Sequence, residues 1–257
     1  MPEFKDLMSG KWQSWWAFQF WIAQAFQIMS IFGYAGFDAF SAIGAQGKAA
    51  NAMAIIATLS FFLFPIFYFM TGCKMSQKIS LVVGTCAFLV QMSLTSQKAW
   101  LQRDLWQFGI GWAGFVNAVL AAVYLFFDKS GEEKPEAGLS SVMACSAFTF
   151  SFIASYGFSA WSAVWTAVGG STKMEAALIF DILGTAFAGF AVLFSFYNCA
   201  KGKMVNSGLA ALCLFVGACI WSSEFASSTA VNDNAFAFHW LAAIASIASV
   251  ALGFMKK

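Results

Sequence analysis

The chain has 257 residues, of which 60% are hydrophobic and only 10% are charged, and its mean hydropathy is +0.72. This composition lies far outside that of soluble domains and predicts an all-α integral membrane protein. The formal net charge of +2 comes without a basic patch, which excludes nucleic acid as an expected partner.

The first 14 residues carry charges but lack the apolar core and small-residue cleavage site of a secretory signal. We expect a cytosolic or interfacial N-terminal segment at residues 1–14, followed by a first span that also serves as an uncleaved insertion signal. Four tryptophans and four glutamines alternate from residue 12 to residue 27. They indicate an interfacial aromatic belt, or alternatively a polar track inside a bundle.

Hydropathy broken by charged residues predicts about eight transmembrane helices. Their ranges are roughly 15–45, 50–72, 79–97, 106–127, 140–167, 175–198, 205–223 and 236–255. Pro65 lies inside the second range and predicts a kink there.

An internal repeat divides these spans into two sets. The octapeptide at 157–164 matches the one at 36–43 in five of eight positions, 121 residues apart. Later correspondences, such as Cys73 with Cys199 and Trp112 with Trp240, continue the repeat with a slowly growing offset. The sequence therefore predicts two tandem four-helix units, 15–129 and 140–257, which insert parallel because four is an even number. The charged segment 130–139 is the expected cytosolic linker.

Basic residues are distributed unevenly between the two sides of this predicted topology. Ten lie on the side of both termini and only four, Lys48, Lys98, Arg103 and Lys173, lie on the other. The positive-inside rule then places the N- and C-termini in the cytosol.

Ionisable side chains within predicted spans are the default candidates for function, because charge in hydrocarbon is costly. The intramembrane polar candidates are Asp38, Asp181, Glu224 and His239. One histidine cannot complete a zinc or bis-histidine haem site, and no motif surrounds a serine nucleophile. We therefore expect no catalytic residues, no metal and no cofactor other than bound lipids. The alternative role of the many aromatic residues is to hold a pigment, quinone or sterol.

Small residues form the faces expected to bring helices together. The repeated octapeptide supplies the candidate helix-contact faces Gly36, Ala39, Ser41, Gly157, Ala160 and Ser162. Similar runs lie at 109–114 and 184–189. Cys73 and Cys199 occupy equivalent repeat positions beside cytosolic lysines, so they are candidates for palmitoylation or, equally, plain buried side chains at helix ends.

Three pieces of the chain carry a family resemblance. Gly111-Trp-Ala-Gly with Tyr124 to Asp128, the segment Gly157 to Trp165, and Ala176 to Phe180 with Tyr197 are similar to spans of MARVEL-type tetraspans of the synaptogyrin/synaptophysin branch. The similarity covers about residues 77–200. The family has four spans rather than eight, and the matching block straddles the predicted repeat boundary. The resemblance implies a four-helix membrane bundle that organises membranes and self-associates, without enzymatic activity.

These features predict a non-enzymatic scaffold that assembles laterally as a homo-oligomer or joins a larger membrane complex, with membrane lipids as partners. A subunit of a respiratory or photosynthetic complex would share the same features. The alternative is a transporter or channel for a small solute, proton or ion. It would use Asp38 and Asp181 on a path lined by Gln24, Gln27, Gln91 and Asn117.

Overall fold

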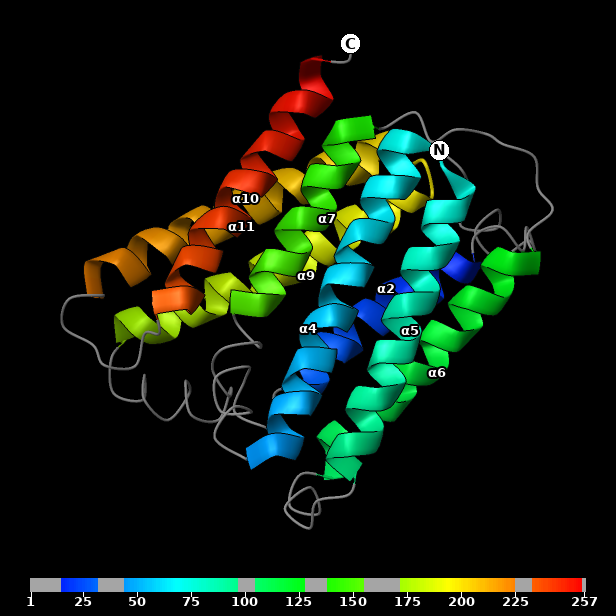
Figure 1. Ribbon diagram of the computed structural model, residues 1–257. Coiled ribbons are helices and arrows are strands. Elements are labelled where there is room, and N and C mark those ends of the chain that lie inside the picture. Colours follow the sequence, from blue (N-terminus) through cyan, green and yellow to red (C-terminus); the bar gives the residue numbers. More distant parts are fainter. Residues whose placement is uncertain are drawn as a thin grey trace.

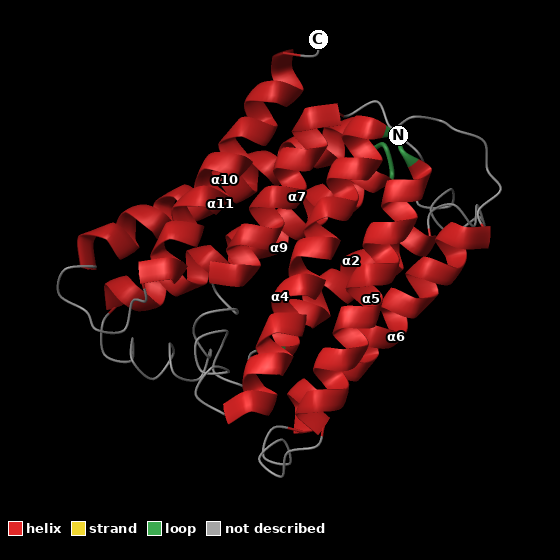
Figure 2. Cartoon of the chain, viewed as in Figure 1, coloured by secondary structure: helices red, strands yellow, loops and turns green. Residues whose placement is uncertain are grey.

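The computed structural model describes residues 15–31, 44–96, 105–127, 138–154, 172–224 and 233–255. Within these ranges every regular element is a helix (Figures 1 and 2). The elements are α2 (Trp15–Ser30), α4 (Gly44–Ile66), the π-helix η4 (Phe67–Thr71), α5 (Lys74–Ser96), α6 (Leu105–Phe127), α7 (Gly138–Phe152), α9 (Thr172–Phe196), α10 (Ala200–Glu224) and α11 (Asp233–Met255).

Six helical segments of the described chain are long and apolar enough to cross a membrane: α4 with η4, α5, α6, α9, α10 and α11. The chain is therefore a multi-pass α-helical membrane protein, as predicted. Helices α2 and α7 have 16 and 15 residues, fewer than the roughly 20 that a span needs. The predicted spans 15–45 and 140–167 continue into residues outside the described ranges, so the count of eight stays a prediction.

Several helices begin earlier than the hydropathy pattern predicts. Helix α4 begins at Gly44 rather than near residue 50, and α10 begins at Ala200 rather than near residue 205. Each early turn contains lysine, which lowers local hydropathy without preventing helix formation, since lysine is a good helix former. Hydropathy therefore located the apolar core of each helix but not its first turns.

The helices pack in two groups of four. In the first bundle, α2 lies along α6, α4 lies along α5, and α5 also contacts α6. In the second bundle, α10 packs against both α9 and α11, and α7 packs against both α11 and α9. Figure 1 shows these neighbours side by side, with the blue-to-green first bundle beside the green-to-red second bundle.

Glycines permit the close approach of helices inside both bundles. A Cβ atom at Gly114 of α6 would lie 2.7 Å from Cβ of Phe26 on α2. A Cβ at Gly184 of α9 would lie 2.6 Å from Cγ of Leu214 on α10. Both distances are too short for a real side chain, so these contacts depend on glycine. In lipid, where no hydrophobic force joins helices, such close packing is a main source of stability.

Aromatic rings join the two bundles at one end of the molecule. The indole of Trp16 on α2 lies 5.7 Å from Phe64, 5.1 Å from Tyr68 and 5.5 Å from Phe196, measured between ring centroids. Phe196 belongs to the second bundle, while the other three belong to the first. Further along α2, Gln24 Nε2 donates a hydrogen bond to Thr149 Oγ1 of α7 at 2.7 Å. Helices α4 and η4 also contact α7, so the junction between the bundles is shared by α2, α4 and η4.

Pro65 precedes a change of helix type. It lacks the N–H that would continue the α-helical hydrogen bonding, and the chain forms the π-helix η4 directly after Ile66. Gly72 ends this turn with a φ of 62°, a left-handed conformation that glycine adopts without steric cost. The structure thus shows a π-helical turn at the place where the sequence predicted a kink.

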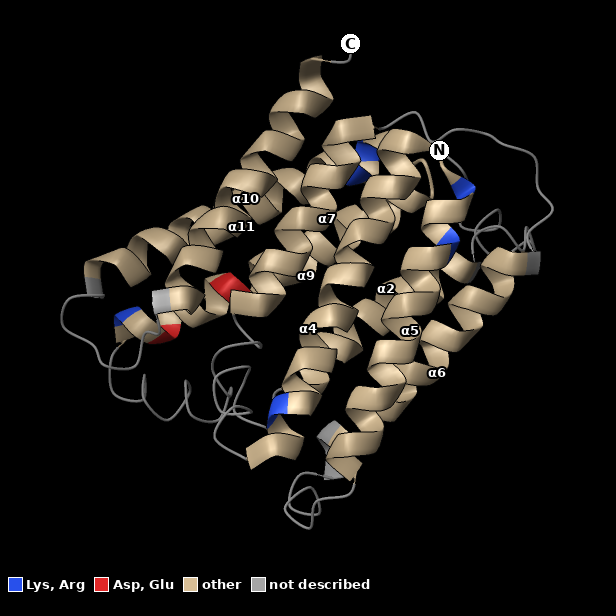
Figure 3. Cartoon of the chain, viewed as in Figure 1, with Lys and Arg blue, Asp and Glu red and all other residues tan. Residues whose placement is uncertain are grey.

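Charged residues of the described helices lie mainly near helix ends (Figure 3). We define the lysine end as the end of the molecule that contains Lys74, Lys78, Lys201 and Lys203, at the starts of α5 and α10. Lys48 and Lys173 lie near the starts of α4 and α9, at the opposite end.

Candidate functional site

Asp181 is a carboxylate buried between the helices of the second bundle. It lies on α9 and only 1% of its surface is exposed. Its neighbours on the same helix include Ala177 and Leu178, which form an apolar cluster with Met174 and Trp221. An acid in such surroundings needs specific partners, because burying an isolated charge is very costly.

Trp221 of α10 supplies the first partner. Its indole Nε1–H donates a hydrogen bond to Asp181 Oδ2 at 2.5 Å, and its side chain is only 5% exposed. Gly217, one turn earlier on α10, faces the same carboxylate, and a Cβ atom there would clash with Asp181 Oδ1. The glycine makes the space for the acid, and the tryptophan fixes its orientation.

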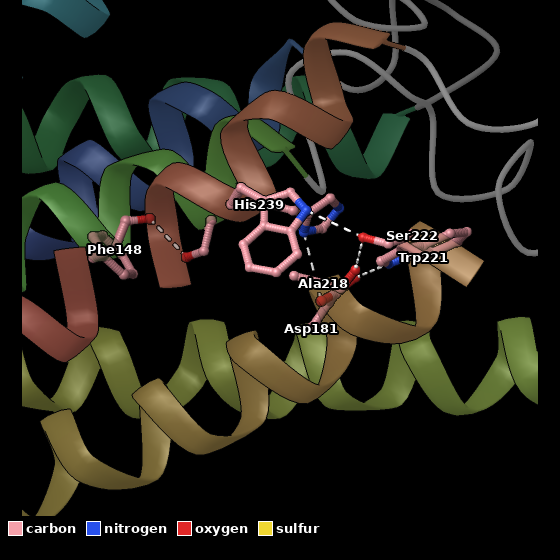
Figure 4. Close-up of polar contacts among 8 residues, drawn as sticks. Phe148, Asp181, Ala218, Trp221, Ser222 and His239 are labelled. Carbon is pink, nitrogen blue, oxygen red and sulfur yellow. Dashed lines mark hydrogen bonds and ion pairs between the residues drawn. The ribbon is translucent and has the colours of Figure 1, made fainter. Parts of the chain in front are cut away.

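His239 of α11 supplies the second partner. Its Nδ1 atom lies 3.5 Å from Asp181 Oδ1, and its side chain is 7% exposed. Its ring lies almost parallel to that of Trp221, with centroids 6.1 Å apart and planes inclined by 25°. Figure 4 shows the three side chains converging from three helices. We call Asp181, Trp221 and His239 the Asp–Trp–His cluster.

One polar atom on each side of this contact is left without a hydrogen bond. Asp181 Oδ1 and His239 Nδ1 are both buried and have no hydrogen-bonding partner among the described residues. They face each other at a distance slightly beyond hydrogen-bond range. Buried polar atoms in this condition are uncommon and call for an explanation.

Ser222 and Trp240 extend the polar contacts beside the cluster. Trp240 Nε1 donates to Ser222 Oγ at 3.2 Å, and Ser222 Oγ donates to the carbonyl of Ala218 at 2.7 Å (Figure 4). The first bond joins α11 to α10 next to His239, and the second lies within α10. The Trp240–Ser222 bond therefore links the two helices independently of the acid.

The first bundle has a different and uncharged polar centre. Gln27 Nε2 donates to Gln91 Oε1 at 3.2 Å, Gln91 Nε2 donates to Ser30 Oγ at 3.0 Å, and Thr58 Oγ1 donates to Gln27 Oε1 at 3.0 Å. All four side chains are buried. This glutamine cluster ties α2, α4 and α5 together by hydrogen bonds among neutral groups, as expected for polar contacts within a membrane bundle.

The structure brings together two of the four predicted ionisable candidates, Asp181 and His239. Glu224 is the last residue of α10, and its side chain is not described. Asp38 lies outside the described residues, as do the helix-contact candidates Gly36, Ala39, Ser41, Gly157, Ala160 and Ser162. Of the residues proposed to line a solute path, Gln27 and Gln91 meet directly, Gln24 joins the bundles, and Asn117 Nδ2 bonds to the carbonyl of Ala113 on its own helix.

The two palmitoylation candidates differ in accessibility. Cys73 is exposed between η4 and α5, whereas Cys199 is half-buried between α9 and α10. Ser76 Oγ lies 3.2 Å from Cys73 Sγ, and its hydrogen bond holds the pKa of this thiol below the ordinary value of 9.0. At the same end, burial raises the pKa of Tyr197.

Sequence reasoning missed Trp221 and Gly217. A tryptophan near a helix end and a glycine within a span are both ordinary in membrane proteins, so neither stands out. The available signal was the helical spacing, since Gly217 and Trp221 are four residues apart and therefore share a face of α10.

The chemistry of the cluster is that of a buried acid beside an imidazole. Two potential ligands do not make a metal site, and the described residues contain no group of three His, Cys, Asp or Glu side chains that could hold an ion. Comparison of the chain with family models, curated protein sequences and solved structures gave no match.

Proposed function

We propose that this protein is a non-enzymatic membrane scaffold that associates laterally with further copies of itself or with a larger membrane complex. The observation that carries the proposal is an outward face of α6 formed by Gly109, Ala113 and Asn117. Residues spaced by four lie on one side of a helix, and small residues with an asparagine favour contact between membrane helices.

The contacts within the chain leave this face available. Gly111 and Gly114 of α6 face inward, where added Cβ atoms would meet Met92 and Phe26. A Cβ at Gly109 would meet nothing within 4 Å, and Ala113 is exposed. Asn117 bonds only to its own helix among the described residues. A neighbouring helix could therefore approach closely and receive a hydrogen bond in the membrane plane.

We also propose that the two bundles are tandem, parallel four-helix units. Their packing corresponds helix by helix: the first helix lies along the fourth in α2–α6 and α7–α11, and the second lies along the third in α4–α5 and α9–α10. Cys73 and Cys199 precede the third helix of each bundle. This correspondence supports duplication of a four-helix unit, with α2 and α7 as the first spans of the two units. That the unit is a MARVEL-type tetraspan is proposed from the sequence resemblance alone.

The lysine end is proposed to face the cytosol together with both termini. Helices α5 and α10 begin there with lysines, and Ser140 near the start of α7 bonds to Ser249 near the end of α11. The positive-inside rule supports this orientation. Labelling of Cys73 by an impermeant reagent from one side of a sealed vesicle tests it.

The self-association proposal is tested by measuring the mass of the purified protein in mild detergent. We expect an oligomer for the parent chain and a shift toward monomer for Gly109→Leu and Asn117→Leu. Gly208→Leu is the matched control, because a Cβ atom added at Gly208 of α10, like one added at Gly109, would meet nothing within 4 Å. A parent chain that is monomeric at every protein-to-detergent ratio would disprove self-association. Co-purification with other subunits would then favour the larger complex.

The burial of Asp181 favours one alternative, a proton- or ion-coupled transporter. In that case Asp181→Asn and Asp38→Asn would abolish solute-dependent flux in proteoliposomes. A scaffold would retain its assembly and its effect on membrane organisation after both substitutions.

A further inference from the structure

Among the buried side-chain atoms of the described residues that have no hydrogen bond, Asp181 Oδ1 and His239 Nδ1 face each other across 3.5 Å. Both atoms are acceptors when the carboxylate is ionised and the imidazole carries its proton on Nε2. In that tautomer the two acceptors repel each other. In the other tautomer Nδ1–H can donate to Oδ1, but the buried pair still carries a net charge of −1, which one added proton removes. The geometry therefore points to an occupant that is a single proton.

We propose that Asp181 and His239 form a proton-binding site, in which one exchangeable proton is shared between Oδ1 and Nδ1. On binding, the carboxylate and the neutral imidazole take up one proton from water, and the pair changes from a net charge of −1 to zero. No other co-reactant is needed. This inference is independent of the scaffold proposal, because a proton site could serve either an assembly or a transporter.

Trp221 defines which oxygen takes part. Its indole N–H donates a hydrogen bond to Oδ2 at 2.5 Å, so Oδ1 is the oxygen that faces the imidazole. Its ring also covers one face of the histidine ring. The apolar residues Met174, Ala177 and Leu178 surround the same place. In such low-dielectric surroundings a net charge is costly, so the neutral pair is favoured over the ionised one.

The other titratable side chains described near the site lie further along the helices. On α9, Glu175 and Lys173 are six and eight residues from Asp181, about 9 and 12 Å along the axis. On α10, Cys219 is exposed, Cys213 is eight residues from Trp221, and Lys201 and Lys203 lie at the lysine end. On α7, the titratable side chain is Cys145, and α2 presents none among its described residues.

The position of the cluster allows exchange with water. Trp221 lies three residues before the end of α10, and His239 lies six residues after the start of α11. At about 1.5 Å per residue, the pair lies roughly 5 to 9 Å below these helix ends. The shorter route for a proton is therefore from the end of the molecule opposite the lysine end.

His239 is the only histidine of the chain, so ¹⁵N-histidine labelling gives a single imidazole to follow. The experiment is an NMR titration of the labelled full-length protein in phosphatidylcholine nanodiscs, from about pH 4 to about pH 10. We expect one titration step in the parent chain. Asp181→Asn should reduce the proton affinity of the imidazole at least about tenfold, because the stabilising negative charge is lost.

Two further variants distinguish proton binding by Asp181 and His239 from a purely structural role of these residues. Trp221→Phe should increase the proton affinity of the pair, since the carboxylate loses a hydrogen bond that favours its ionised form. Glu175→Gln is the matched control, an acid on the same helix that should leave the titration unchanged. Sodium or potassium added at constant pH should also have no effect.

Infrared spectroscopy of the parent chain keeps the proposal testable if Asp181→Asn does not fold. The carboxylic-acid carbonyl band should change in the same pH step as the imidazole signal. The proposal is overturned if the parent chain shows no titration step in this range, or if the step occurs without a change in the carboxyl band. It is also overturned if folded Asp181→Asn keeps a proton affinity of the imidazole within about threefold of the parent, or if sodium displaces the proton.

Discussion

Asp181 of α9 fits against Gly217 of α10, and the carboxylate fills the space where any larger residue would place its Cβ atom. The same glycine lies one helical turn before Trp221, which holds the other oxygen of the acid. The close contact between α9 and α10 therefore depends on the same residues that hold the buried acid in place.

Replacement of Gly217 by alanine should destabilise the second bundle. The added methyl group overlaps Asp181 Oδ1, and the short aspartate side chain cannot move away without losing its bond to Trp221. We expect a loss of about 1–3 kcal/mol in the free energy of unfolding, measured by titration with a denaturing detergent. Gly208→Ala on the same helix has open space, so it should be neutral or stabilising by up to about 1 kcal/mol. Equal effects of the two substitutions would contradict this account.

Replacement of Gln27 by leucine should cost about 1–3 kcal/mol of stability, because Gln91 and Thr58 would lose their buried partner. A double-mutant cycle with Gln91→Leu should show a coupling energy between the two sites, since the two side chains bond directly. Leu59→Ala on the outward side of α4, where the side chain is 55% exposed, is the control and should have little effect. Additive effects of Gln27→Leu and Gln91→Leu would argue against the glutamine cluster.

Replacement of Trp16 by alanine should weaken the junction between the bundles. The indole contacts Phe64, Tyr68 and Phe196, so its removal leaves a cavity. We expect the free energy of unfolding to fall by about 3–5 kcal/mol. We expect the two bundles to unfold in separate transitions in the variant. Phe190→Ala on α9, where the ring is 46% exposed, should keep the parent's behaviour. An unchanged single transition in Trp16→Ala would show that the junction does not depend on this ring.

Alkylation of Cys73 should depend on Ser76. The hydrogen bond from the Ser76 hydroxyl lowers the pKa of the thiol, so the reactive thiolate forms at a lower pH than in a free cysteine. In a variant whose only cysteine is Cys73, the rate should reach its midpoint below pH 9.0. Ser76→Ala should move this midpoint upward, and Ser223→Ala at the opposite end should not. A midpoint that is the same with and without Ser76 would refute the assignment.

Local patterns predicted the six long apolar helices of the described chain but not the contacts of its polar residues. Asp181 and His239 were identified as candidates because each is ionisable and lies within an apolar run. Their proximity was not foreseen, because the rotation of α9 and α11 about their axes depends on how side chains fit between helices. The repeat gave no help here, because Asp181 and His239 have no counterpart of their own type in the first half of the chain.

The sequence by itself determined that the chain is helical and embedded in a membrane. Long apolar runs must satisfy their backbone hydrogen bonds within the segment when no water is available, so hydropathy located the apolar cores of the six long helices, though not their first turns. Only the tertiary structure decided that Asp181, Trp221 and His239 meet, that Gln27 and Gln91 bond to each other, and that Gly109 faces outward while Gly111 and Gly114 face inward. These contacts depend on the fit of particular side chains between helices far apart in the chain, and a one-dimensional pattern does not contain that fit.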